Sequence, residues 1–176
     1  ILKMGAHEVP KKDQIKIFNE IFRVLKPKGK FVTWELALTN DNQKFFQTFI
    51  HKKDELSGFT SMMENRYFPK HSETLKNFKA AGFKKVHEVY TKYYHPNLKL
   101  RAHELVSTER AMILKNKGKV SPHESKKIKA LSVSRIQELT EFTKILLTKK
   151  ITKAVKFKEN KSGIDFEIEK KIYIGY

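Results

Sequence analysis

The sequence predicts an α/β fold. Amphipathic helices alternate with strands rich in β-branched and aromatic residues, a helix–turn–strand unit stands near the start, and the C-terminal end has the alternation of strands. The chain has 176 residues, of which 39% are apolar, with 13 Phe, 6 Tyr and one Trp, which is enough to form a core. At this length we expect one domain, or one domain with an appendage.

The first helix–turn–strand unit spans residues 11–36. Apolar residues at three- and four-residue spacing predict a helix over residues 11–25, and they are Ile15, Phe18, Ile21, Phe22 and Leu25. Pro27 and Gly29 end this helix, because the residue before Pro avoids helical angles and Gly favours a turn. Residues 30–36 read as the strand that follows.

The same alternation continues to about residue 96. We expect a second helix over residues 40–53, followed by an irregular stretch over residues 54–70. Ser72 is the predicted cap of a helix that ends at Gly82. A long strand is expected over residues 83–94.

Beyond residue 96 the pattern becomes helical. A helix is predicted over residues 98–115, and Ser121-Pro122-His123-Glu124 is a capping-box sequence that opens a second. A third helix is expected over residues 135–147. Residues 97–150 are therefore expected to form a helical insertion.

The C-terminal residues 151–176 alternate apolar and polar side chains, which predicts an antiparallel β-hairpin that completes the sheet. Its first strand is expected over residues 151–157 and its turn over residues 160–163. The second strand carries apolar residues of one parity, namely Ile164, Phe166, Ile168, Ile172 and Ile174.

The chain is strongly basic, with 37 Lys and Arg against 19 Asp and Glu and a formal net charge of +18. Only five of the basic residues are Arg, and the excess is spread along the chain, which favours a solvated Lys-rich surface over an anionic partner such as RNA. The apolar runs are too short to span a bilayer, so we expect no membrane partner and a cytoplasmic location.

The composition also limits the chemistry. The chain has no Cys, which excludes a disulfide framework, a thiolate zinc site and a cysteine nucleophile. The seven His are scattered without the spacing of a ligand set, so no metal site is predicted. No nucleophile-elbow motif supports Ser-His-Asp catalysis.

Three motifs over residues 1–96 give the chain a family resemblance. The first runs from Gly5 to Pro10 and contains His7, the second is the helix ending from Glu20 through Arg23-Val-Leu-Lys-Pro-Lys-Gly29, and the third is Ala80-Ala81-Gly82-Phe83. In this order and spacing they resemble class I S-adenosylmethionine-dependent methyltransferases.

The resemblance implies the C-terminal half of a Rossmann-like, seven-stranded methyltransferase sheet. The family's glycine-rich cofactor loop and the acidic residue for the ribose are absent from this sequence, in which every Gly is isolated. The chain is thus expected to be a fragment, or to need an N-terminal half from the same longer chain or from a separate polypeptide. A missing half is also expected because the outer edge of the first strand and an apolar face would otherwise be bare. Alone the chain is expected to be inactive, because the main cofactor loop is missing.

The implied activity is methyl transfer from S-adenosyl-L-methionine, to a small-molecule acceptor on our hypothesis. Ligands of open α/β sheets bind beyond the carboxyl ends of the strands. The resemblance therefore assigns Gly5, Ala6, His7 and Glu8 to the cofactor and Glu35 to the acceptor. His7 is the candidate base if the acceptor must lose a proton, because an imidazole titrates near neutrality. Alternatively, His7 caps the next helix, and Glu35 pairs with a Lys.

Arg66 and Tyr67 are further candidates for the acceptor side. They follow Met62 and Met63 in an aromatic, Met-rich stretch that either forms a lid over an apolar acceptor or simply packs a loop. The resemblance implies that the helical insertion shapes the acceptor pocket or a subunit interface, although its charged candidates are better explained as solvated faces of amphipathic helices. These are Glu104, Arg110, Lys126, Lys127 and Arg135.

Two alternatives to an enzyme remain open. One is a non-catalytic basic module that binds RNA or an acidic protein, and it should show steeply salt-dependent RNA binding. The other is a structural half-subunit that stabilises a partner chain, and it should co-purify without catalysis. Oligomerisation is also left open by the sequence.

Overall fold

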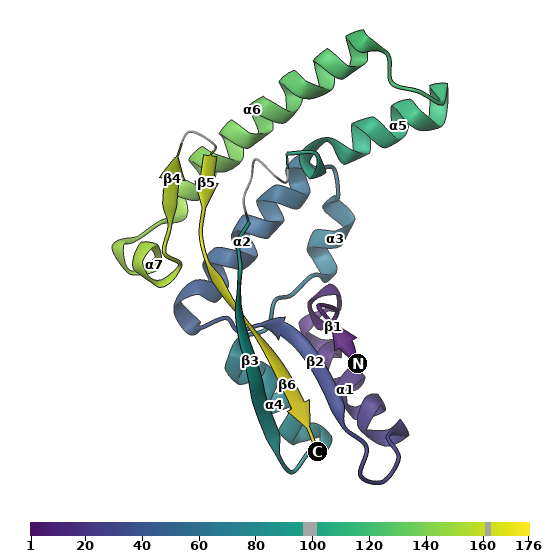
Figure 1. Ribbon diagram of the computed structural model, residues 1–176, viewed down its shortest axis with the longest axis vertical. Helices are drawn as coiled ribbons and strands as arrows, with labels where there is room; N and C mark the ends of the chain where they lie inside the picture. Colours follow the sequence, from purple (N-terminus) through teal and green to yellow (C-terminus); the bar gives the residue numbers. More distant parts are fainter. Residues whose placement is uncertain (97–101, 161–162) are drawn as a thin grey trace. The chain divides into compact units, whose positions relative to one another are not determined.

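The computed structural model describes residues 1–96, 102–160 and 163–176, and it shows an α/β fold with a mixed sheet (Figure 1). The strand order is β1 (Leu2–Lys3), β2 (Phe31–Leu36), β6 (Ile168–Gly175) and β3 (Val86–Tyr94). β1 is parallel to β2, whereas β6 lies antiparallel to both of its neighbours. The predicted fold class is therefore confirmed, as are the strands expected over residues 30–36 and 83–94.

The chain divides into two compact units. The first consists of residues 1–47, 64–94 and 167–176 and contains the four-stranded sheet. The second consists of residues 48–63 and 95–166. Residues 48–63 thus fall in the same unit as residues 95–166, and the last ten residues fall in the unit with the sheet, while the division into domains at residues 96 and 150 stays a prediction.

The helices around the sheet follow the predicted order. They are the 3₁₀ turn η1 (Ala6–Glu8), α1 (Lys11–Val24), α2 (Asn40–Leu56), α3 (Thr60–Asn65) and α4 (His71–Ala81). The helices expected over residues 11–25 and 40–53 are confirmed. The irregular stretch expected over residues 54–70 is partly wrong, because α2 continues to Leu56 and α3 adds a helical turn. Helix α3 can form here because the chain contains no Pro between Gly58, where φ is +77°, and Pro69.

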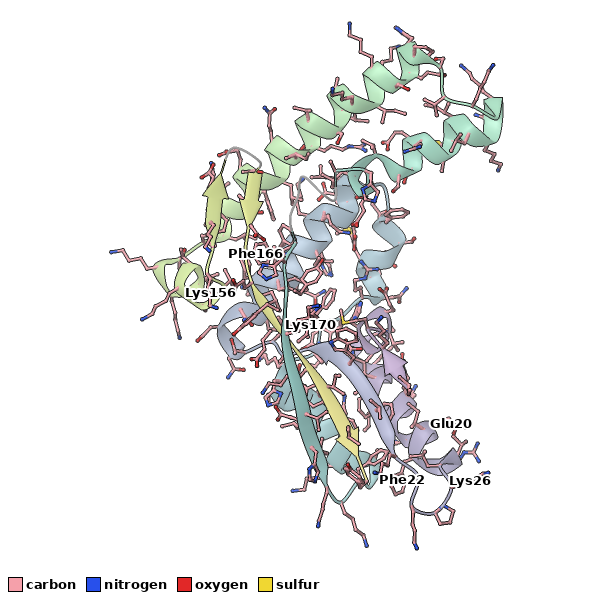
Figure 2. All side chains as sticks on the ribbon, in the orientation of Figure 1. Glu20, Phe22, Lys26, Lys156, Phe166 and Lys170 are labelled. Atoms are coloured by element: carbon pink, nitrogen blue, oxygen red, sulfur yellow. The ribbon has the colours of Figure 1, made fainter. Side chains whose placement is uncertain are left out.

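Helix α1 ends as the sequence predicts. Leu25 leaves helical angles two residues before Pro27, and the amide of Gly29 donates to the carbonyl of Lys26 at 2.8 Å to close the turn into β2. Glu20 and Lys26 lie on the exposed surface of α1 and of the turn that follows it (Figure 2).

Helix α4 begins one residue before its predicted cap. Glu73 accepts a hydrogen bond from the amide of Lys70 at 2.9 Å, so the carboxylate of the first turn caps the helix in place of Ser72. The C-terminal end is as predicted, because Gly82 takes a left-handed conformation with φ +107° that a β-carbon would disfavour.

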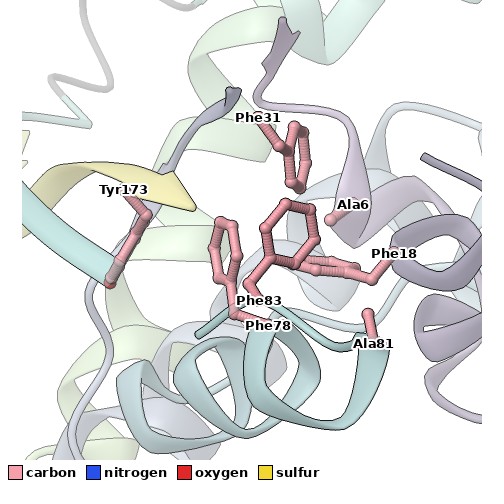
Figure 3. Close-up of a cluster of buried hydrophobic side chains, with 7 residues drawn as sticks. All are labelled: Ala6, Phe18, Phe31, Phe78, Ala81, Phe83 and Tyr173. Carbon is pink, nitrogen blue, oxygen red and sulfur yellow. The ribbon is translucent and has the colours of Figure 1, made fainter. Parts of the chain in front are cut away.

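An aromatic cluster joins α1 and α4 to one face of the sheet (Figure 3). Phe78 on α4 is fully buried, and its ring centroid lies 5.0 Å from that of Phe18 on α1 and 5.2 Å from that of Phe31 on β2. The remaining members of the cluster are Ala6, Ala81, Phe83 and Tyr173. The packing is close, since a β-carbon on Gly175 would lie 2.6 Å from the Phe78 ring.

The last strand does not bury the alternate residues that the sequence predicts to be buried. Ile168 is buried, but further along β6 the buried residues are Tyr173 and Gly175, while Ile172 and Ile174 are only partly covered. The reason is that β6 is an interior strand whose Tyr173 face packs on α4, where its hydroxyl lies 2.9 Å from Nδ1 of His71. A bulge in β3 between Glu88 and Tyr90 accompanies this arrangement.

The second unit contains most of the predicted insertion. Its elements after residue 95 are η2 (Glu104–Val106), α5 (Ser107–Lys117), α6 (Pro122–Leu146), α7 (Lys149–Ala154), β4 (Lys158–Asn160) and β5 (Gly163–Asp165). The predicted capping box is confirmed: Ser121 Oγ accepts from the Glu124 amide at 3.2 Å, and the Glu124 carboxylate accepts from the Ser121 amide at 2.9 Å. The helix expected over residues 98–115 is found only from Ser107, because residues 104–106 form the 3₁₀ turn η2; residues 98–101 lie outside the described part.

Two expectations for this unit are wrong. The helices expected to open at residue 121 and to span residues 135–147 are one continuous helix, α6, because no Gly or Pro separates them. Residues 151–157 do not form a strand, since Thr148 caps the short helix α7 by accepting from the Ile151 amide at 3.2 Å. A small hairpin is present, but it pairs β4 with β5, and only β6 joins the main sheet. Of the predicted turn, residues 161–162 lie outside the described part.

Within the described ranges, none of the helices has the length and apolar character needed to cross a membrane.

Candidate active site

A buried carboxylate organises the loop that follows β1. Glu35, on β2, is 1% exposed, and its Oε1 accepts hydrogen bonds from the amides of Gly5 and Ala6, both at 2.9 Å. Its Oε2 lies 3.2 Å from Nδ1 of His7. Three of the four residues assigned to the cofactor thus contact Glu35, the residue assigned to the acceptor.

His7 lies between two carboxylates and against an aromatic ring. It is 6% exposed, and its Nε2 lies 3.2 Å from Oε1 of Glu8. The imidazole stacks on Phe68 with ring centroids 4.5 Å apart and planes 14° apart. Nδ1 therefore faces the buried carboxylate, and Nε2 is the nitrogen on the side of the half-exposed Glu8.

Glu8 connects this loop to the segment after α3. Its carboxylate forms a multidentate ion pair with Arg66, with Nη2 at 2.8 Å from one oxygen and 2.9 Å from the other. Arg66 Nε adds a third hydrogen bond at 3.1 Å. The Arg66 side chain is 11% exposed and that of Glu8 is 43% exposed, so the pair lies at the rim of the loop.

Tyr67 belongs to a second polar group beside the loop. Its hydroxyl donates to Glu73 at 2.8 Å, its amide donates to the His7 carbonyl at 2.9 Å, and Lys11 pairs with Glu73 at 2.8 Å. The Lys11 ammonium also lies 4.7 Å from the centre of the Tyr67 ring. Burial raises the pKa of the Tyr67 hydroxyl, so it stays protonated and able to donate.

The Glu73 carboxyl has a lowered pKa. Burial alone would raise it, but the Lys11 ammonium, the Lys70 amide and the Tyr67 hydroxyl all favour the charged form and together outweigh burial. These contacts stabilise the fold above the ordinary pKa near 4.5, and the stabilisation disappears as the pH falls through the lower pKa of the folded state.

We expect Glu73→Gln to remove part of the acid sensitivity of the fold. The wild type should lose stability faster than the variant as the pH drops below about 4.5, so that the difference between their urea midpoints narrows toward acid pH. Glu64→Gln, at an exposed position of α3, is the control and should follow the wild-type curve. A difference between wild type and Glu73→Gln that does not change with pH would contradict this assignment.

Three glutamines that the sequence analysis missed hold the backbone of residues 66–68. Gln14 donates to the Tyr67 carbonyl at 2.7 Å, Gln47 donates to the Arg66 carbonyl at 2.8 Å, and Gln43 donates to the Phe68 carbonyl at 3.0 Å. Gln47 Oε1 also accepts from the Phe68 amide at 2.8 Å. Their sequence signal is weak, because single glutamines on amphipathic helices are usually solvated.

The structure brings together the site residues predicted within residues 1–96, whereas the charged candidates of the insertion lie in the second unit. The residues of η1, Glu35 at the carboxyl half of β2, and Arg66 with Tyr67 form one connected set of hydrogen bonds, ion pairs and ring contacts. Arg66 and Tyr67 each hold their segment in place, Arg66 through its ion pair with Glu8 and Tyr67 through its hydrogen bonds to Glu73 and to the His7 carbonyl. Whether these residues contact a cofactor or an acceptor stays a prediction.

The sheet beside this site has an edge at β1 and one thinly covered face. β1 stands at one end of the strand order and β3 at the other; among the described residues β1 pairs with β2 alone, and Ile1 is fully exposed. On β2, Phe31, Thr33 and Glu35 are at most 2% exposed, whereas Val32 and Trp34, which point to the opposite face, are only partly buried. Ile172 and Ile174, their cross-strand partners on β6, are partly buried as well.

The site is a network of hydrogen bonds and ion pairs without a metal-binding cluster. The described residues contain no cluster of three His, Asp or Glu side chains arranged to hold a metal ion. The loop after β1 carries an imidazole and a carboxylate, while the amides of Gly5 and Ala6 and the carbonyls of residues 5–7 are hydrogen-bonded within the protein. It has no glycine-rich turn of the kind that holds a dinucleotide-like cofactor.

Comparison with known proteins shows similarity in structure alone. No protein-family model and no curated protein sequence matches the chain. A candidate methyltransferase from Bacillus halodurans superposes with a TM-score of 0.68 at 16% identity, covering 98% of this chain and 61% of that protein. The YcgJ protein of Bacillus subtilis superposes with a TM-score of 0.60 at 14% identity, covering 98% of this chain and 60% of its own.

The chain therefore spans about three fifths of the length of both structures. At these identities the similarity concerns the fold. The α/β architecture of this chain is thus part of an architecture found in a candidate methyltransferase.

Proposed function

We propose that this chain is the C-terminal half of an S-adenosylmethionine-dependent methyltransferase that acts on a small molecule. The observation that carries the proposal is the connected set of Glu35, the loop of residues 5–8 and the Arg66–Tyr67 segment at the carboxyl ends of β1 and β2. In open α/β sheets, ligands bind at this edge. The structural similarity to a candidate methyltransferase supports the same reading.

In this proposal the loop of residues 5–8 forms one wall of the cofactor site. When bound, S-adenosylmethionine supplies an electrophilic methyl group on a sulfonium sulfur, so the protein mainly positions donor and acceptor. Glu35 holds the amides of Gly5 and Ala6 and the ring of His7 in place, and it is a positioning residue rather than a contact of the acceptor.

His7 is the proposed base for an acceptor that loses a proton. Its Nδ1 faces the buried Glu35, which leaves Nε2 as the nitrogen that would receive the proton. Nε2 lies 3.2 Å from Glu8, which Arg66 also holds, so in this proposal Glu8 turns away from Nε2 before the imidazole accepts a proton there. We propose that the Arg66–Glu8 pair flanks the acceptor, with Tyr67 beside it.

The rest of the cofactor site would come from an N-terminal half, either of a longer chain or of a separate polypeptide. The open edge of β1 can pair with a further parallel strand, because its backbone groups on that side have no strand partner among the described residues. The partly buried face with Val32, Trp34 and Ile174 can receive covering helices. The comparison proteins, which are longer than this chain, support this organisation.

The test is a calorimetric titration of S-adenosylmethionine into the natural polypeptide that carries this sequence, isolated with any chain that accompanies it. We expect saturable binding that weakens about tenfold or more in His7→Gln, because the variant disturbs the Glu35-anchored wall. Lys12→Ala, at an exposed position four residues beyond the loop, should bind like the wild type.

Two outcomes would overturn the proposal. One is a folded wild type that shows no saturable binding of the cofactor. The other is an equal affinity of wild type and His7→Gln, which would place the cofactor elsewhere. Binding of single-stranded RNA that weakens steeply with salt, together with no cofactor binding, would instead support the basic binding module.

A further inference from the structure

The helical hairpin of the second unit contains a cavity. Helices α5 and α6 run antiparallel and are joined by a short loop (Figure 1). Between them lies a cavity of about 540 Å³, which is within the range of small-molecule sites. The side chains of η2, α5, the loop and α6 line it, and most of them are apolar: Ala102, Val106, Val120, Ile128, Val133 and Ile136.

The cavity exists because α5 is not packed closely on α6. None of the described residues of α5 is buried, and Met112 and Leu114 are 53% and 42% exposed. Only Val106, at the junction of η2 with α5, is buried among the apolar lining residues. A helix pair that leaves so much apolar surface uncovered gains stability if an apolar body fills the space.

The charged residues of the cavity are all basic. Arg110 on α5, Lys129 on α6 and His103 before η2 belong to the lining, which contains no carboxylate. Among the described residues, Arg110 and Lys129 have no ion-pair partner, whereas Arg23, Arg66 and Arg135 each pair with a Glu. Arg is scarce in this chain, so an Arg at an apolar cavity that is lined by no carboxylate indicates an anionic ligand.

Two acidic side chains that neighbour the lining residues in sequence are already engaged. Glu109, the neighbour of Arg110, pairs with Arg135 at 2.5 Å, and Glu124, near the start of α6, pairs with Lys117 at 2.7 Å. The Lys117 ammonium and the Ser121 groups lower the pKa of Glu124 to about 2, so it stays charged and bound at neutral pH. Arg110 and Lys129 therefore remain available to an external anion.

We propose that the α5–α6 cavity binds an amphipathic organic anion, with an acyl-like apolar body between the helices and an acidic head group on Arg110 and Lys129. The apolar walls fit the body, and the basic residues fit the head group as charge-assisted hydrogen-bond donors. This site lies within the second unit and does not depend on the proposed methyltransferase function.

The test is a titration of the full chain with dodecanoate below its micellar concentration. Dodecanoate should bind with one-to-one stoichiometry, and dodecanol and dodecyltrimethylammonium should each bind at least tenfold more weakly. Arg110→Gln/Lys129→Gln should weaken dodecanoate about tenfold or more and leave dodecanol unchanged. Dodecyl phosphate distinguishes the head group: tighter binding than dodecanoate indicates a phosphate ligand.

The control is Lys126→Gln/Lys127→Gln, which removes two charges from exposed positions of α6 that do not line the cavity. This variant should bind dodecanoate like the wild type, and Val133→Trp should block it, because Val133 is a partly exposed wall residue. Equal binding of dodecanoate, dodecanol and dodecyltrimethylammonium by the wild type would contradict the proposal whatever the variants do. So would equal losses in both double variants, or saturable binding of an acidic amphipathic peptide without binding of dodecanoate.

Discussion

Glu35→Ala is expected to lower the free energy of unfolding by about 3 kcal/mol, because three polar groups lose their partner inside the protein. The amides of Gly5 and Ala6 and Nδ1 of His7 all face the Glu35 carboxylate, which is 1% exposed, so water does not readily replace it. Glu35→Gln should lose less, because the amide oxygen can still accept from one or both backbone amides. Urea unfolding followed by circular dichroism measures both changes.

The control for this experiment is Glu20→Ala. Glu20 pairs with Arg23 on the exposed surface of α1, and its removal should leave the unfolding midpoint unchanged. If Glu35→Ala were as stable as the wild type, the carboxylate would not be the anchor of the loop after β1. The assignment of Glu35 as a positioning residue would then fail.

Phe78→Ala is expected to cost about 4 kcal/mol, the largest loss among the substitutions considered, because the ring is at the centre of the aromatic cluster. Phe78 is fully buried and contacts Phe18, Phe31, Phe83 and Tyr173 with ring centroids between 5.0 and 6.3 Å apart. Its removal would leave a cavity between α1, α4 and the sheet. The measurement is again the urea midpoint, with the slope checked for a change in cooperativity.

Phe22→Ala provides the matched comparison. Phe22 also contacts Phe83, at 4.9 Å between centroids, but it is 42% exposed, so its loss should cost about 1 kcal/mol. Similar losses for the two variants would show that the aromatic cluster is not the core that joins α1 and α4 to the sheet.

The elements that follow local rules were predictable from the sequence. Helix α1 has a clear apolar stripe and a Pro-Gly stop, and α6 begins at a complete capping box. The end of α1 and the start of α6 therefore depend on residues that are close in the chain. The site residues could be named because motif and sheet topology together place Gly5–Glu8 and Glu35 at one edge of the sheet. That these residues contact one another is a tertiary fact that the sequence pattern does not contain.

The errors come from effects that reach across the chain. Alternating residues at 151–157 suit a strand, but the Thr148 cap and the nearby turn favour the helix α7. In β6 the buried side changes along the strand, because Tyr173 packs on Phe78 and reaches His71, although the apolar Ile172 and Ile174 have the opposite parity. The contacts of Glu35 could not be predicted either, since a charged residue in a strand gives no sign of which buried amides it will accept from.

The central claim is that this chain supplies one half of a cofactor-binding sheet, and the intact mass of the natural protein, with its N-terminal residue identified, tests it most directly. We predict a polypeptide well above the 20.7 kDa of this sequence, or a second polypeptide that co-purifies with it, to supply the strand beside β1 and the cover of the Trp34 face. A natural protein of 20.7 kDa that is isolated without a partner would contradict the account, because nothing would then complete the cofactor site.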